Sequence, residues 1–423
     1  MQQSSIASNL SPRFSMVAKY FAASIFAYVL LNFLLMLNYD SIQGHYFQPI
    51  ILALVHIGTL GWITMIIFGA MFQLVPVVLE VKLFSELMGE IQFWIFLVGA
   101  AGLITGFWNF DTGIHLTASA IFLAAAMLLF IINITVTMFR VKKWNITGVY
   151  LAAALFYLLS TAAAGLLMAI NLGHPFIKGN HLQYLKLHAD VALIGWVTMI
   201  IMGVSYKLIP MFTLSHGYSM KSAVWAFVLV NTGLLGLTTV MHYENLGLLY
   251  SGFVCLTAAG IFFFLFQIYL IIKKRIRKKL DIGLKHSIVS FFFMGLTALL
   301  GVYLVLNNFK DIFTELRLVL LYGYLVIFGF FSMLTVGQLY KILPFLAWYH
   351  KYSSKVGLEK VPLLKDMYSE KSASLEFVLM TAALAAGIPG LLFSLSGLLL
   401  ISFSVMFISS LIFAYNMISI IRT

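Results

Sequence analysis

The chain has 423 residues, of which 62% are hydrophobic and only 9% are charged, and its formal net charge is +12. A soluble globular protein carries about 25% charged residues, so this composition excludes a soluble enzyme. The basic residues fall in short loops between apolar runs, which indicates membrane topology and not nucleic-acid binding. The single cysteine, Cys255, excludes an internal disulfide and a thiolate metal cage, and it is expected to be a small buried side chain.

Apolar runs long enough to cross a bilayer, at about 20 residues each, recur from end to end. Twelve spans are expected, at 17–38, 47–79, 92–108, 114–139, 147–171, 184–213, 223–241, 247–272, 287–306, 317–349, 374–394 and 396–421. The sequence therefore predicts an all-α integral membrane protein of twelve transmembrane helices, forming one domain over residues 1–423.

Basic residues gather in the loops on one side of this twelve-span arrangement, and the loop 273–285 is the richest in them. Cytoplasmic loops carry an excess of Lys and Arg, so both termini are predicted to face the cytoplasm, in a bacterial or archaeal cytoplasmic membrane. Three histidines on that side, His216, His286 and His350, are expected to be solvated or to lie at the membrane interface.

One segment occurs three times, at 61–76, 195–210 and 329–344, and consecutive copies are separated by 134 residues. Such a repeat predicts three four-helix units, at approximately 14–140, 145–279 and 284–421. The repeated segment lies on the second span of each unit. Its central glycines, Gly69, Gly203 and Gly337, let a neighbouring backbone or a flat ligand come close.

Ionisable side chains inside membrane spans are costly and mark a functional site by default. His56, Asp190 and Tyr324 occupy equivalent positions in the three repeats, five residues before the first glycine. His56 is the best candidate for a haem ligand, because it is a lone histidine in a continuous apolar helix. The alternative is a histidine that only hydrogen-bonds a neighbour on its own helix.

Two residues earlier, the equivalent positions hold Leu54, His188 and Tyr322. Residues two apart on a helix point about 200° apart, so these positions form a second ring. His188 is the second candidate metal ligand, and Asp190 is expected to orient its imidazole, as a carboxylate often does beside a metal-bound histidine. The alternative is a polar patch near the outer surface.

Twelve spans in three four-helix units, with His56 at the outer start of span two, resemble subunit I of the haem–copper oxidases, including the cbb3-type oxidases and nitric oxide reductases. The resemblance covers the whole chain by topology. In that family, histidines of spans two and ten hold the low-spin haem, another span-ten histidine holds the high-spin haem, and copper takes histidines from spans six and seven. The resemblance implies that His56 binds haem and that His188 is the copper ligand.

Two departures from the family pattern stand out. Span ten has Tyr322 and Tyr324 in place of a His-x-His pair, and span seven has no histidine pair. The resemblance therefore implies a divergent member that kept the scaffold and a b-type haem, with copper doubtful. Tyrosine can bind haem iron, so the ligand opposite His56 is His188, Tyr322, Tyr324 or none, with Gly69 and Gly337 beside the cofactor.

The expected function is a membrane haem protein in respiratory electron transfer or in binding O2 or NO. If it is an enzyme, it is an oxidoreductase like cytochrome c oxidase or nitric oxide reductase. Its expected partners are membrane lipid, cytochrome c or quinol, and other respiratory subunits, without nucleic acid. The alternative is a non-catalytic protein of oxidase assembly or of the nitric oxide response. A transporter is disfavoured, because the repeated prolines lie near span ends and not at the midplane.

Overall fold

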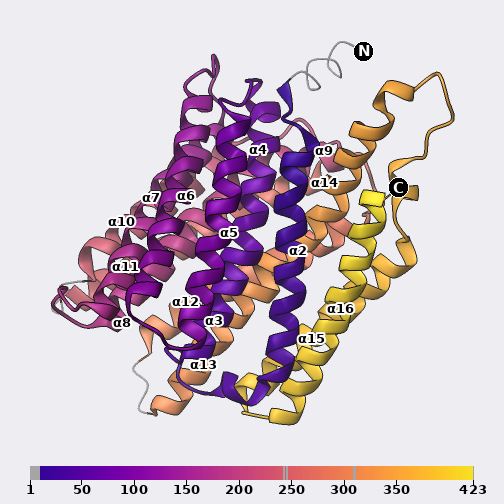
Figure 1. Ribbon diagram of the computed structural model, residues 1–423. Coiled ribbons are helices and arrows are strands. Elements are labelled where there is room, and N and C mark those ends of the chain that lie inside the picture. Colours follow the sequence, from indigo (N-terminus) through magenta and orange to yellow (C-terminus); the bar gives the residue numbers. More distant parts are fainter. Residues whose placement is uncertain (1–9, 242, 244–245, 308–310, 423) are drawn as a thin grey trace. The chain divides into compact units, whose positions relative to one another are not determined.

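The computed structural model describes residues 10–241, 243, 246–307 and 311–422, and the regular elements in these ranges are helices (Figure 1). Twelve helices of this described part are long and apolar enough to cross a membrane, which confirms the predicted all-α membrane fold. The predicted limits of most spans agree to within a few residues. Span six, for example, was expected at 184–213 and extends over His181–Thr213.

The chain forms two compact units by its internal contacts, and these do not follow the repeat limits. The described residues of unit 1 lie within Met1–Tyr20, Ile66–Lys278 and Gly301–Leu306. Those of unit 2 lie within Phe21–Met65, Lys279–Leu300 and Asn307–Thr423. We use the names quartet 1, quartet 2 and quartet 3 for spans one to four, five to eight and nine to twelve.

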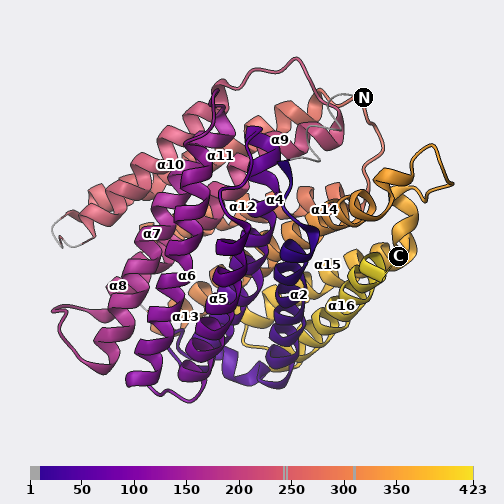
Figure 2. The ribbon, with the colours of Figure 1, turned by 45° about the horizontal axis from the view of Figure 1, so that its top comes forward.

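Unit 1 is built mainly from the later spans of quartet 1 and all of quartet 2. Its helices are α4 (Met65–Leu79), α5 (Glu86–Trp108), α6 (Ile114–Met138), α7 (Ile146–Gly173), α8 (His181–Asp190), α9 (Met199–Thr213), α10 (Lys221–Val240) and α11 (Gly247–Lys273). Polar caps fix two helix starts: the Ser85 side chain accepts from the Met88 amide at 3.1 Å, and Asn145 accepts from the Gly148 amide at 2.9 Å. Helices α10 and α11 run side by side (Figure 2).

Unit 2 combines most of the first span with quartet 3. Its helices are α2 (Phe14–Leu37) from Phe21 onward, α3 (Pro49–His56), α12 (Ile282–Leu306) as far as Leu300, α13 (Ile312–Tyr324), α14 (Met333–Tyr352), α15 (Glu370–Leu392) and α16 (Ser396–Arg422). Helix α15 is capped by Ser369, which accepts from the Ser372 amide, and it runs beside α16 (Figure 1).

A buried tryptophan explains why the first span packs with quartet 3 in unit 2. The Trp62 ring stacks on Tyr28 of α2 with ring centroids 4.6 Å apart. Its indole N–H donates to the Ser332 hydroxyl, which belongs to quartet 3, at 3.0 Å. The equivalent Trp196 lies in unit 1, 6.0 Å from the rings of Phe68 and Phe130 of quartet 1. The repeated tryptophan therefore links two quartets within each unit.

The second span of every quartet contains a π-helical segment that the sequence does not predict. These segments are η2 (Ile57–Thr64), η3 (Val191–Thr198) and η5 (Leu325–Ser332), and they keep the 134-residue spacing of the repeat. The Thr198 hydroxyl follows the wider turn, since it donates to the Leu193 carbonyl five residues earlier at 2.7 Å. Each segment begins directly after the equivalent positions of His56, Asp190 and Tyr324. π-helical turns are frequently found at functional sites, so this placement makes these three positions candidates for a function.

The repeated glycines bring the second helix of a quartet against the first. A Cβ atom at Gly203 would lie 2.6 Å from Cβ of Tyr150 on α7. A Cβ atom at Gly337 would contact His286 and lie 2.8 Å from the Gly283 carbonyl oxygen on α12. At Gly337, therefore, α14 and α12 approach each other closely. Gly69, the equivalent glycine of quartet 1, is buried on α4.

Cys255 is exposed on α11, so the expectation that it is buried is wrong. Other apolar side chains of the same helix, such as Phe262 and Phe266, are exposed as well. A small apolar side chain needs no protein cover where the solvent is lipid, which is why hydropathy alone did not separate the two positions.

We expect Gly203→Val to destabilise the protein by about 1–3 kcal/mol, because the added carbons would overlap Tyr150 and push α9 away from α7. The matched control is Gly252→Val on α11, where a Cβ atom would meet nothing within 4 Å. Thermal unfolding of both variants in detergent, followed by tryptophan fluorescence, measures the difference. Equal stability of the two variants would contradict the packing described.

Candidate functional site

His56, the predicted haem ligand, is the last residue of α3 and is half-buried. Its Nδ1 atom lies 2.7 Å from the Leu52 carbonyl oxygen. A carbonyl oxygen only accepts hydrogen bonds, so Nδ1 carries the proton and, in the neutral ring, Nε2 carries the lone pair. This is the form in which a histidine binds a metal through Nε2 while its other nitrogen is held by the backbone.

His188 lies on α8 in unit 1 and packs against α7, where its Cε1 atom is 3.0 Å from the position of a Cβ atom at Gly165. Asp190 is the last residue of α8 and interacts electrostatically with Lys186, one turn earlier. The Lys186 ammonium lies over the Tyr250 ring of α11, 4.8 Å from its centre. Because His56 belongs to unit 2, a cofactor shared by the two histidines stays a prediction, as does the role of Asp190.

The two span-ten tyrosines differ in their surroundings. The Tyr324 side chain is buried, and its hydroxyl lies 3.2 Å from the Ser402 hydroxyl and 3.3 Å from the Ala383 carbonyl oxygen. Tyr322 is half-buried on the same helix, α13. This difference in burial between Tyr322 and Tyr324 agrees with the two rings of positions expected from helical geometry. Ligation by either residue stays a prediction.

In the part of the chain that the structure describes, no group of three or more His, Cys, Asp or Glu side chains is arranged to hold a metal ion. Haem iron needs only one or two protein ligands, so this result does not bear on His56, His188, Tyr322 or Tyr324 as single haem ligands.

The structure also contains a buried ionisable pair in unit 2 that the sequence analysis missed. The His286 side chain is 0% exposed, and its Nε2 atom lies 3.1 Å from Oε2 of Glu376, which is 1% exposed. The other ring nitrogen, Nδ1, lies 2.9 Å from the Ile282 carbonyl oxygen. The expectation that His286 is solvated is therefore wrong. It follows the basic loop in sequence, but α12 already begins at Ile282, and α14 covers this first turn through Gly337.

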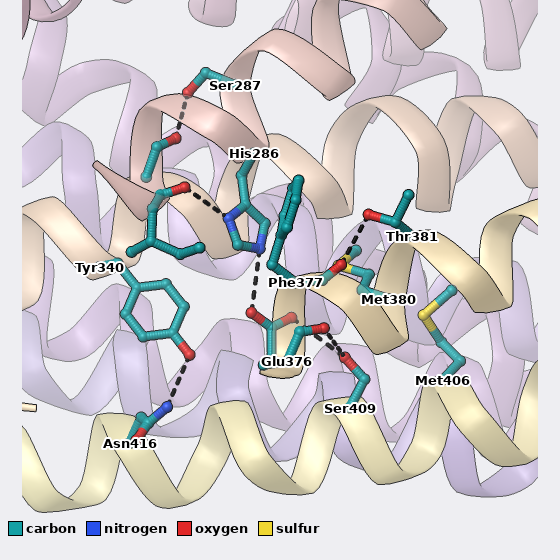
Figure 3. Close-up of polar contacts among 12 residues, drawn as sticks. His286, Ser287, Tyr340, Glu376, Phe377, Met380, Thr381, Met406, Ser409 and Asn416 are labelled. Carbon is teal, nitrogen blue, oxygen red and sulfur yellow. Dashed lines mark hydrogen bonds and ion pairs between the residues drawn. The ribbon is translucent and has the colours of Figure 1, made fainter. Parts of the chain in front are cut away.

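The surroundings of this pair include side chains of α14, α15 and α16 (Figure 3). The Ser409 hydroxyl of α16 donates to Oε1 of Glu376 at 3.2 Å. The Tyr340 ring of α14 lies beside the imidazole, with ring centroids 6.1 Å apart, and its hydroxyl accepts from the Asn416 amide at 3.0 Å. The Phe377 ring closes the other side at 4.8 Å. Both carboxylate oxygens and both imidazole nitrogens thus have partners.

An ion pair between Lys341 and Asp281 lies near the start of α12. Next to it, Tyr368 packs on Tyr340 with ring centroids 5.2 Å apart. Burial, reinforced by the negative charges of Asp281 and Glu370, raises the pKa of Tyr368 to about 12. Tyr368 therefore stays a neutral cover over this end of the quartet.

The position of His286 has an equivalent in each of the other quartets. This equivalence was the sequence signal that could have predicted that His286 is buried. Tyr20 and Tyr150 pack on Phe72 and Tyr206 of their second helices, with ring centroids 5.6 and 5.4 Å apart, as His286 packs on Tyr340. In the sequence, Tyr20 and Tyr150 each begin a Tyr-x-Ala-Ala segment. The third copy has a histidine in place of the tyrosine and is recognised only from the contacts.

No protein-family model matches this chain, and no curated protein matches it either.

We expect His286→Ala to reduce stability by about 3–5 kcal/mol, because it leaves the Glu376 carboxylate buried without its partner. His350→Ala is the matched control, since His350 is an exposed histidine of the same unit. Thermal unfolding in detergent at neutral pH compares the variants, and a loss of stability no larger in His286→Ala than in His350→Ala would argue against the buried pair.

Proposed function

We propose that this chain is a membrane haem protein similar to subunit I of the haem–copper oxidases, with His56 as a ligand of a b-type haem. Its role is respiratory electron transfer or the binding of O2 or NO. In this proposal both termini face the cytoplasm of a bacterial or archaeal cell, and the partners are cytochrome c or quinol and other respiratory subunits.

The observation that carries the proposal is the state of the His56 ring together with its place in the span. The Leu52 carbonyl holds the proton on Nδ1, so the lone pair is at Nε2, as iron ligation requires. The π-helical segment η2 starts at the next residue. His286 makes the same contact with its own helix, so the hydrogen bond alone does not separate a haem ligand from a packing residue. The place of His56 inside a span and beside an irregular turn is what favours the ligand.

The donor set fits a haem held by unit 2: His56 would hold the iron, and Tyr322 of the same unit is the candidate second ligand. Bound haem would supply one-electron chemistry or a site for a diatomic gas. The apolar residues around His56, such as Ile57 and Ala53, are buried and would keep water from that ligand.

One observation favours the alternative, a non-catalytic protein of oxidase assembly or the nitric oxide response that reuses the scaffold. The Tyr324 hydroxyl, at the position where the family has a haem-binding histidine, is hydrogen-bonded within quartet 3. Gly387 of α15 lies against the same hydroxyl, so this side chain takes part in helix packing.

We expect the purified protein to show a Soret absorption band that His56→Ala abolishes and His350→Ala leaves intact, because His56, unlike His350, would bind iron. Absorption spectra and haem extraction, with thermal unfolding as a check of folding, measure this. A folded but colourless wild-type protein favours the scaffold alternative, and equal loss of haem in both variants would refute the assignment of His56.

A further inference from the structure

Each quartet has a polar contact between its first and third helices at the same place in the repeat. In quartet 1 the Tyr20 hydroxyl lies 2.7 Å from the Gly89 carbonyl oxygen and also contacts the Gln92 side chain. In quartet 2 the Tyr150 hydroxyl donates to the Ala223 carbonyl at 2.8 Å. In quartet 3 the contact is the one between His286 and Glu376.

The third helices align through their caps, and this alignment pairs Gln92 with Glu376. Each lies seven residues after a capping serine, Ser85 in quartet 1 and Ser369 in quartet 3. Quartet 3 thus has an ionisable histidine where quartet 1 has a tyrosine, and a glutamate where quartet 1 has a glutamine. The scaffold itself needs only the neutral pair.

Ionisable groups are an expensive way to make this contact. Removing a charged pair from water costs free energy that neutral groups do not lose, and replacing such pairs by neutral ones is often neutral or stabilising. The same two helices of quartet 1 are also joined by the ion pairs Arg13–Glu86 and Lys19–Glu90, but those charges are partly exposed. At the buried position itself, quartets 1 and 2 use neutral groups, so helix packing does not account for the burial of His286 and Glu376. Buried ionisable residues in membrane helices mark a functional site.

The geometry also fixes where protons lie. Nδ1 of His286 faces a carbonyl oxygen, so it carries a proton. Nε2 faces Oε2 of Glu376 at 3.1 Å, and two acceptors would repel each other at that distance. A second proton therefore lies between Nε2 and Oε2. With it the pair is neutral overall; without it the pair carries one negative charge and loses this hydrogen bond.

We propose that His286 and Glu376 form a proton-binding site, which takes up and releases this shared proton through the end of quartet 3 that holds the Lys341–Asp281 ion pair. The ligand is H⁺ and its binding atoms are Nε2 and Oε2. The site stands on the contacts of quartet 3 alone, so it does not depend on the haem proposal.

The pair lies close to the end of quartet 3 that holds the Lys341–Asp281 ion pair. His286 is the fifth residue of α12 and Glu376 the seventh of α15, so the glutamate lies about 9 Å along the helix from its start. The amides of Asn416 and Gln338 donate to Tyr340 and Ser287, and their oxygens are among the buried atoms of the described residues that have no hydrogen-bond partner. Buried polar atoms of this kind are commonly satisfied by internal water, which would carry the proton to the pair.

The other titratable groups around the pair are tyrosines and one ion pair. Tyr28 of α2 and Tyr340 of α14 interact electrostatically with Glu376, and Tyr368 packs on Tyr340. Tyrosines ordinarily titrate near pH 10, above the range in which histidine and glutamate change charge. The Lys341–Asp281 ion pair lies closer to the helix start and is partly exposed. Among the described residues, the fully buried ionisable groups of this cluster other than tyrosines are therefore His286 and Glu376.

The test is an infrared difference spectrum of the full-length protein in nanodiscs between about pH 5 and about pH 9. The key variant combines His286→Tyr with Glu376→Gln, which reproduces the Tyr20 and Gln92 contact of quartet 1. We expect the wild type to show imidazole and carboxyl bands that titrate together, and the double variant to fold with these bands missing. The Glu376→Gln single variant should lose the carboxyl band and shift the imidazole band.

Thermal unfolding distinguishes loss of the site from loss of the fold. The double variant should unfold within about 3 °C of the wild type, whereas His286→Ala should unfold at least about 5 °C lower, because it leaves Glu376 without the imidazole. If the double variant does not fold, the nearly isosteric Glu376→Gln variant decides. Titrating bands that are identical in the wild type and a folded variant would overturn the proposal. Haem content is read from the same samples, so a failure of the haem assignment would be seen separately.

Discussion

The structure depends on one constraint, that a polar group inside a helix bundle in lipid must find its partner within the protein. The three quartets meet it in the same way, by a side chain on the first helix that reaches the third helix beside a ring of the second. The hydroxyls of Tyr20 and Tyr150 do this with carbonyl oxygens, and His286 does it with a carboxylate. The repeat therefore conserves a packing geometry while its chemistry differs between copies.

The second span of each quartet has two features at different positions along its length. Near one end, glycines such as Gly203 and Gly337 allow the first helix to approach. Toward the other end, a π-helical segment follows His56, Asp190 or Tyr324. The contacts of Gly203 and Gly337 and the candidate ligands thus occupy different turns of the same span. A change of ligand type between quartets need not disturb the glycine contacts.

Much of the fold could be predicted from the sequence, because span length, loop charge and a repeat of constant spacing are properties of single segments. The twelve spans followed from these. The burial of His286 did not, since it depends on where α12 begins and on how closely α14 approaches at Gly337. Glu376 was overlooked for the same reason. It lies at the start of an apolar run, and the sequence does not show whether its side chain faces solvent or a histidine.

The candidate site was predictable only in part. His56 stands out in the sequence, and the structure adds the hydrogen bond that orients its ring. The π-helical segments could not be foreseen, because the same apolar residues fit an α-helix or a π-helix, and tertiary packing decides between them. The different surroundings of Tyr322 and Tyr324 likewise depend on α15 and α16, which are distant in sequence.

The account's central claim is that the three quartets share one polar contact and that quartet 3 has turned it into a proton-binding site. Transplanting the pair tests this most directly: Tyr20→His combined with Gln92→Glu gives quartet 1 the side chains of quartet 3. We expect this variant to fold and to show, in infrared difference spectra between acidic and alkaline pH, a second set of titrating imidazole and carboxyl bands. A folded variant without additional titrating bands would contradict the claim, because equivalent geometry would then not suffice to bind the proton.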